Sequence, residues 1–270
     1  MTPGSKPIVL EARGLVRAYG GEKAVDGVDL RLHAGEVYGF LGRNGAGKTT
    51  TIKTLMGIAK SDQGTVSILG ADTRRPGTRE KRLIGYVAQE QHFYPWMTCA
   101  ELGRFVGGLY PSWDAAEFDR LLELFMLPPK KKSSALSHGM RVKLALSLAL
   151  APRPPLLILD EPSAGLDPVA RRELLDLIGT CARADHRAIF FSTHLVDEVE
   201  RVADRVGIID RGKMIFEGTL DELRATLPAH SSQGKALDLE DAFIELLLRG
   251  KNPGSAGSSS THPATPDPSP

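Results

Sequence analysis

Hydrophobic residues between positions 8 and 250 form short apolar runs that alternate with stretches of helical spacing. Leu156–Asp160 and Ala188–Ser192 are such runs, typical of strands that are buried on both faces. Helical spacing follows them at Pro168–Ala184 and Leu195–Ala203. This alternation predicts the α/β class, a parallel sheet with helices on both faces. A further helix is predicted at Met140–Ala151, and further strands at Ile8–Arg13, Val28–His33, Glu36–Leu41, Thr65–Leu69, Ile84–Ala88, Arg205–Asp210 and Lys213–Phe216.

Over residues 98–127 the spacing of the apolar residues changes, and this change predicts two helices inserted between the strands. Apolar residues recur there at intervals of three and four. Pro111 separates the two helices, and Pro128 ends the second. We therefore expect one domain over residues 7–250, with a helical insertion at about 90–137 and with the antiparallel strands at its ends.

The end of the chain differs from the rest in composition. Residues 251–270 contain no Phe, Tyr or Trp and no aliphatic residue larger than alanine. Such a segment cannot bury enough apolar surface to offset the entropy lost on ordering, so it is predicted to be a disordered tail. A loop is predicted at Ser231–Gly234, before a last helix.

Composition narrows the possible partners and the compartment. Lys and Arg number 34 against 33 Asp and Glu, a formal net charge of +1, so no nucleic-acid partner is expected. No apolar run approaches the roughly 18 to 20 residues that span a bilayer, and the first residues lack the apolar stretch of a secretion signal. Cys99 and Cys181 lie far apart in sequence and suggest no disulfide framework. These features predict a protein of the reducing cytosol.

The strongest chemical signal is a glycine-rich segment between a predicted strand and a predicted helix. Residues 42–49 read GRNGAGKT and fit the phosphate-binding pattern G-x-x-x-x-G-K-[ST]. The glycines let consecutive backbone N–H groups point inward, and the helix start adds partial positive charge. Lys48 is expected at the β- and γ-phosphates, and the Thr49 hydroxyl at Mg²⁺. The candidate nucleotide contacts are Gly42, Arg43, Asn44, Gly45, Ala46, Gly47, Lys48, Thr49 and Thr50.

Two acids follow the buried strand that starts at Leu156. Asp160 at the end of this strand can hold Mg²⁺ beside the phosphate loop. Glu161 comes next and can orient or deprotonate a water that attacks the γ-phosphate. An ordinary acidic pair at a strand end is the plain alternative, but Pro162 directly afterwards favours a defined turn.

Several motifs in fixed order make the chain, over about residues 7–250, resemble the ATP-binding subunits of ATP-binding-cassette (ABC) transporters. Each of these motifs alone would be a weak signal, and the order in which they occur is what is specific. The matching residues are Tyr19 in Arg-Ala-Tyr-Gly, Gln89 in Tyr-Val-Ala-Gln-Glu, Ser137 and Gly139 in Leu136–Met140, the loop Ser163–Asp167, and His194 in Phe-Ser-Thr-His.

The resemblance implies a RecA-like P-loop NTPase core with an antiparallel β subdomain and a helical insertion. It implies ATP and Mg²⁺ as ligands, with Tyr19 stacking on adenine, Ser137 and Gly139 contacting the nucleotide of a second subunit, and Gln89, Glu161 and His194 as catalytic residues. Thr49, Gln89 and Asp160 would be the metal ligands. Two such subunits, identical or homologous, would enclose two ATP and drive an integral membrane permease from the cytoplasmic face, with export the expected direction.

The segment Leu136–Met140 departs from the family's usual Leu-Ser-Gly-Gly-Gln. His138 replaces a glycine and Met140 replaces the glutamine, a form that looks like the bacterial YtrB-like subgroup, which Trp113–Lys132 also resembles. We expect His138 to face the γ-phosphate of the partner's nucleotide. How this departure affects turnover stays open.

Two other interpretations remain. A soluble ABC-type ATPase of translation or DNA maintenance would usually carry two cassettes or a long coiled coil, and neither is present in the sequence. A small-molecule kinase would share the phosphate loop but would not explain residues 136–140 and 163–167 together. The sequence does not identify the transported substrate.

Overall fold

The computed structural model describes residues 6–72, 78–226 and 238–249. The predicted loop at Ser231–Gly234 and the predicted tail at 251–270 lie outside these residues. Within the described residues, no helix is long and apolar enough to cross a membrane. Cys99 and Cys181 are buried free thiols.

A six-stranded sheet in the order β10-β9-β3-β8-β7-β6 forms the centre of the described fold. All its neighbouring strands are parallel except β9 and β10. The central strands β3, β8 and β7 are buried along their whole length, which explains their continuous apolar runs. The strands are β3 (Val37–Gly42), β6 (Ile84–Val87), β7 (Leu156–Asp160), β8 (Ala188–Thr193), β9 (Arg205–Asp210) and β10 (Lys213–Thr219).

A four-stranded antiparallel sheet covers one face of the central sheet together with helix α1 (Lys48–Leu55). Helix α1 thus lies on this face, as the sequence predicts, and the antiparallel sheet covers it as well. The shared core unites Leu10 and Leu30 of the smaller sheet with Phe190 of the central one. Such strands bury one face only, so their apolar residues alternate with polar ones. The strands are β1 (Ile8–Tyr19), β2 (Glu22–His33), β4 (Gln63–Ile68) and β5 (Ala71–Asp72).

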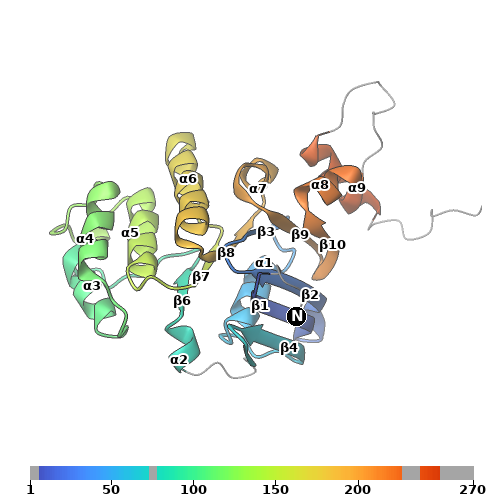
Figure 1. Ribbon diagram of the computed structural model, residues 1–270, viewed down its shortest axis with the longest axis horizontal. Coiled ribbons are helices and arrows are strands. Elements are labelled where there is room, and N and C mark those ends of the chain that lie inside the picture. Colours follow the sequence, from blue (N-terminus) through green and yellow to red (C-terminus); the bar gives the residue numbers. More distant parts are fainter. Residues whose placement is uncertain (1–5, 73–77, 227–237, 250–270) are drawn as a thin grey trace, which may run out of the picture.

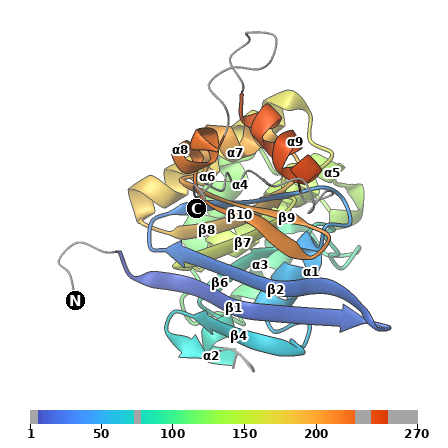
Figure 2. The ribbon, with the colours of Figure 1, turned by 90° about the vertical axis from the view of Figure 1, so that its right-hand side faces the viewer.

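The opposite face of the central sheet is covered by helices (Figure 2). Leu174 and Ile178 of α6 pack with Val199 of α7 over Phe191 and Ile208 of the sheet. Helix α6 begins at Pro168, as the sequence predicts, and the Asp167 side chain caps it. The helices are α6 (Pro168–Asp185), α7 (Val196–Val202), α8 (Leu220–Ala225) and α9 (Leu239–Arg249).

The inserted helices form a separate small core at one end of the molecule (Figure 1). Leu102 of α3 and Phe118 of α4 pack with Leu144 of α5. Gly103 permits this closeness, because a Cβ built there would lie 2.2 Å from a Phe118 ring carbon. The helices of this core are α3 (Cys99–Gly107), α4 (Ala115–Leu124) and α5 (His138–Leu150), and the 3-10 turn η1 (Ser133–Ala135) precedes α5. The short helix α2 (Thr78–Lys81) lies earlier in the chain, before β6.

Candidate functional site

The glycine-rich segment forms a tight turn between β3 and α1. Gly45 and Gly47 both adopt positive φ, 80° and 107°. A Cβ on Gly47 would lie 2.4 Å from the carbonyl oxygen of Ala24, and one on Gly42 would lie 2.6 Å from that of Ile209. No side chain caps the start of α1. Its first N–H groups, with the positive end of the helix dipole, therefore suit a phosphate.

Two hairpins hold this loop from behind. The backbone N–H of Gly212 in the β9–β10 turn donates to the Ala46 carbonyl at 2.8 Å, and the Gly212 carbonyl accepts from the N–H of Asp26 in β2 at 2.8 Å. A cavity of about 460 Å³ opens over residues 43–46 and is also lined by His194, Asp210 and Arg211. The loop is thus a fixed cradle beside an open space.

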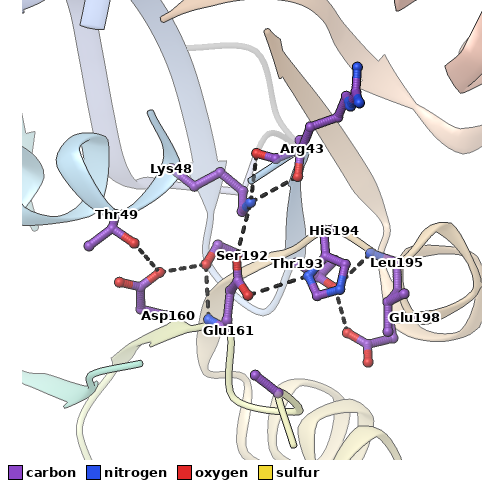
Figure 3. Close-up of polar contacts among 12 residues, drawn as sticks. Arg43, Lys48, Thr49, Asp160, Glu161, Ser192, Thr193, His194, Leu195 and Glu198 are labelled. Carbon is purple, nitrogen blue, oxygen red and sulfur yellow. Dashed lines mark hydrogen bonds and ion pairs between the residues drawn. The ribbon is translucent and has the colours of Figure 1, made fainter. Parts of the chain in front are cut away.

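Asp160, at the carboxyl end of β7, lies beside the loop. Its Oδ1 accepts from the hydroxyl of Ser192 at 2.8 Å and from that of Thr49 at 3.3 Å (Figure 3). Burial raises the pKa of this carboxyl above its ordinary value, although both hydrogen bonds act to lower it. Ser192 occupies the facing position on β8, so the sheet register sets this contact.

The metal prediction can be tested against the second oxygen of Asp160. Its Oδ2 is buried and has no hydrogen-bond partner among the described residues. A buried carboxylate oxygen beside a threonine hydroxyl and a phosphate cradle fits a hard cation such as Mg²⁺. The described residues contain no group of three or more His, Cys, Asp or Glu side chains that could hold a metal by themselves. Phosphate and water would therefore complete the coordination.

Glu161 bridges the phosphate loop and the loop after β8. Its Oε1 lies 3.0 Å from Lys48 Nζ, and its Oε2 lies 3.3 Å from His194 Nδ1 (Figure 3). Lys48 also donates to the Gly42 carbonyl at 2.8 Å. The backbone N–H of Glu161 donates to Ser192 Oγ at 3.0 Å, and its φ is 45°, a region that side-chain-bearing residues rarely adopt. Asp160, Glu161, Lys48 and His194 thus meet at one edge of the sheet.

A buried carboxylate supports the loop that carries His194. Glu198 of α7 is fully buried, and its Oε2 accepts from the Thr193 hydroxyl at 2.6 Å. That hydroxyl in turn accepts from the N–H of Leu195 at 3.0 Å. Arg171 of α6 pairs with the other Glu198 oxygen at 3.5 Å. The imidazole therefore extends from a fixed backbone while its side chain stays 40% exposed.

Gln89 and Tyr19 lie at the margins of this group. Gln89 follows β6, whose Val87 pairs with Leu159 next to Asp160, so its backbone reaches the same edge of the sheet. Tyr19 ends β1, and its half-exposed ring lies under the Arg17 guanidinium, 4.4 Å from the ring centroid. Their roles toward metal and adenine stay predictions.

Ser137 and Gly139 lie elsewhere in the molecule. They stand at the start of α5, which begins at His138, two residues earlier than predicted, because Ser137 caps it by accepting from the N–H of Met140 at 3.3 Å. Among the described residues, no hydrogen bond or ion pair joins Ser137 or Gly139 to the phosphate loop, and α5 lies well apart from α1 (Figure 1). That His138 faces a partner's phosphate concerns the dimer and stays a prediction. Within its own chain, the His138 ring contacts the carbonyl of Ala164.

Sequence reasoning missed Ser192 and Gly212. Ser192 was part of the apolar run that predicted β8, and a hydroxyl at the carboxyl end of a buried strand was the available signal. Gly212 lies between the predicted strands Arg205–Asp210 and Lys213–Phe216, and nothing in its local sequence points to Ala46.

A phosphate cradle follows the central strand β3, and an acid ends the parallel strand β7, which is separated from β3 by β8 alone. This arrangement defines a P-loop nucleoside triphosphatase. Residues 25–164 match the family model described as ABC transporter. The chain belongs to this family, in the class of its ATP-binding subunits, so the sequence-based assignment of family and fold is confirmed.

Known relatives agree with this assignment. The bacitracin transport ATP-binding protein BcrA of Bacillus licheniformis is 36% identical over 88% of this chain and 80% of its own length. The ABC transporter ATP-binding protein YtrB of Bacillus subtilis is 31% identical over 80% of this chain and 74% of its own length. A solved structure of an ATP-binding subunit of an ABC transporter is 30% identical, covers 88% of this chain and 99% of its own, and superposes with a TM-score of 0.79. These similarities favour a transporter subunit over a kinase or a soluble ATPase of another kind.

Proposed function

We propose that this chain hydrolyses ATP to drive a separate membrane permease. The observation that carries the proposal is the position of Glu161, whose two carboxylate oxygens contact Lys48 and His194 beside the phosphate cradle. A γ-phosphate held by the loop and Lys48 would lie next to a carboxylate that can accept a proton from water.

The residues divide the work of phosphoryl transfer. Loop N–H groups and Lys48 bind the phosphates and stabilise charge on the transferred group. Glu161 orients and deprotonates the attacking water, and His194 stabilises the developing charge. Thr49, Asp160 and Gln89 would hold Mg²⁺, which when bound neutralises charge between the β- and γ-phosphates.

We propose a dimer because the site is divided within one chain. Ser137 and Gly139 stand at the start of α5, away from the phosphate loop of the same chain. In a pair of chains facing each other, the α5 start of one would close over the nucleotide of the other. Its hydroxyl and N–H groups suit a phosphate.

The permease is proposed to bind the helical insertion. This contact would hold the chain on the cytoplasmic side of the membrane. Tyr94, Trp96 and Phe105 form an aromatic cluster, with ring centroids 5.2 Å apart for Tyr94–Trp96 and 5.7 Å apart for Tyr94–Phe105. Trp96 is 67% exposed, and the other two rings are about half exposed. Exposed aromatic residues of this kind mark protein interfaces.

Export is the proposed direction. It rests on the resemblance of Leu136–Met140 to the YtrB-like subgroup and on the relative that is named for bacitracin transport. The transported compound itself stays unassigned.

The test uses Glu161→Gln in the full chain. The variant should bind MgATP normally and lose most steady-state hydrolysis, because the amide cannot accept the proton from water. It should also form dimers with MgATP and not with MgADP in light scattering, because the bridging nucleotide persists.

Lys48→Ala is the matched control, since it should fail one step earlier, at nucleotide binding. Wild-type turnover in Glu161→Gln would refute the catalytic assignment. An equal mass with MgATP and MgADP would refute the dimer.

A further inference from the structure

His138 makes a contact that the proposed mechanism does not use. It is the first residue of α5 and follows the cap Ser137. Its ring nitrogen Nε2 lies 2.8 Å from the carbonyl oxygen of Ala164. Because a carbonyl only accepts, Nε2 must carry the proton and donate. Ala164 belongs to the loop of residues 161–167, which joins β7 to α6.

Packing reinforces this hydrogen bond. Gly165 has a φ of 71°, and a Cβ built there would lie 3.1 Å from Cδ2 and Nε2 of His138. A Cβ on Gly139 would lie 3.4 Å from a Leu166 methyl carbon. Two successive residues of α5 therefore touch three successive residues of the loop.

The same loop fixes the catalytic carboxylate. The N–H of Ala164 donates to the Glu161 carbonyl at 3.1 Å, and the N–H of Leu166 donates to the Ser163 carbonyl at 3.1 Å. Glu161 has a φ of 45°, a conformation that persists only where the surroundings impose it. The middle of the loop is thus held by His138, and its first residue carries the carboxylate that contacts Lys48 and His194.

We propose that His138 is a positioning residue, which holds the loop 161–167 through the Ala164 carbonyl and so keeps Glu161 in place for hydrolysis. The inference rests on the proposed function. In the proposed dimer, the start of α5 serves the partner's nucleotide, whereas Glu161 serves the chain's own. His138 therefore connects the two ATP sites, so that closure of one site acts on the carboxylate of the other.

Replacement of His138 should leave the fold intact. The side chain is exposed and borders a cavity of about 380 Å³ that residues after β6, among them Glu90 and Gln91, also line. Substitutions at exposed positions usually change stability little, so a change at this position acts on the loop contact rather than on folding.

The decisive comparison is between His138→Gln and His138→Asn. The glutamine amide nitrogen can occupy the place of Nε2 and donate to Ala164, whereas the asparagine amide is one bond shorter and cannot reach it. Each variant is purified as the full chain, and kcat, the Hill coefficient for ATP and the nucleotide Kd are measured. We expect His138→Asn and His138→Ala to lower kcat three- to tenfold, the effect of one hydrogen bond of ordinary net strength, and to lower the Hill coefficient. His138→Gln should stay within about twofold of the wild type, and the Kd should be unchanged in all.

Equal kcat and Hill coefficients in the Gln and Asn variants would overturn the inference, because the hydrogen bond would then be irrelevant. A weakened nucleotide Kd in His138→Asn would also overturn it, since the ring would then act on nucleotide directly. Failure of the proposed function is distinguishable, because the wild-type chain itself would then show no hydrolysis or no ATP-dependent dimer.

Discussion

Single residues of the phosphate cradle differ in why they must be glycine. Gly45 has a positive φ, and no atom lies within 4 Å of a Cβ built there, so only backbone conformation restricts it. Gly47 has a positive φ too, and its Cβ would lie 2.4 Å from the Ala24 carbonyl. Replacing Gly45 therefore tests the cost of the backbone conformation alone, whereas replacing Gly47 tests that cost together with the steric contact to Ala24.

Gly45→Ala should reduce the free energy of unfolding by about 1 to 2 kcal/mol, the cost of a left-handed alanine. Gly47→Ala should reduce it more and should also weaken MgATP binding, because the loop must move away from β2. Urea unfolding and nucleotide titration of both variants check this. Equal effects of the two changes would show that the Ala24 contact is irrelevant.

Site residues also differ in whether the local sequence reveals them. Lys48 and Thr49 were identified because they belong to a phosphate-binding motif, and Asp160 because it ends an apolar run. Ser192 and Gly212 act through strand register and a hydrogen bond between distant segments. Such contacts depend on tertiary structure and leave no pattern in a short window.

Elements were predicted best where they are buried on both faces. Leu156–Asp160 and Arg205–Asp210 begin and end as the apolar runs indicate. β1 and β2 are longer than predicted, because register shifts near Gly14 let the pairing continue through polar residues. Two helices were not predicted, α2 with 4 residues and α8 with 6, because both are too short to show a helical period.

The start of α6 gives a prediction about pH. Asp167 Oδ1 accepts from the N–H groups of Ala170 and Val169, both at 3.0 Å. The bond from Ala170 is the largest cause that lowers the pKa of Asp167 below its ordinary value of 3.8. A lowered pKa in the folded state stabilises the fold above that ordinary value, and this contribution is lost as pH falls through the folded pKa.

Asp167→Asn keeps a capping oxygen but not the charge. The wild type should therefore unfold at a higher urea concentration than this variant at pH 7, and the difference should shrink as pH falls from about 5 toward 3. A difference that does not vary with pH would mean that the charge contributes nothing.

At the scale of the whole molecule, the exposed aromatic cluster gives a prediction about membrane attachment. Trp96→Ala should abolish co-sedimentation with native membranes and leave the ATPase activity of the isolated chain unchanged, because the cluster lies outside the hydrolytic site. Met126, 78% exposed after α4, provides the matched control, since Met126→Ala removes an equally exposed apolar side chain from another surface. If both variants sediment like the wild type, the permease docks elsewhere.

The strand order also bears on how the protein is made. β3, which leads into the phosphate loop, lies between β8 and β9, so Val37 pairs with Ile189 and Tyr38 with Arg205. Ala46 accepts its hydrogen bond from Gly212. During synthesis the loop leaves the ribosome long before any of these neighbours exists. The newborn chain therefore acquires the ability to hold nucleotide only after the β9–β10 turn has emerged, and its first half must wait with unpaired strand edges until then.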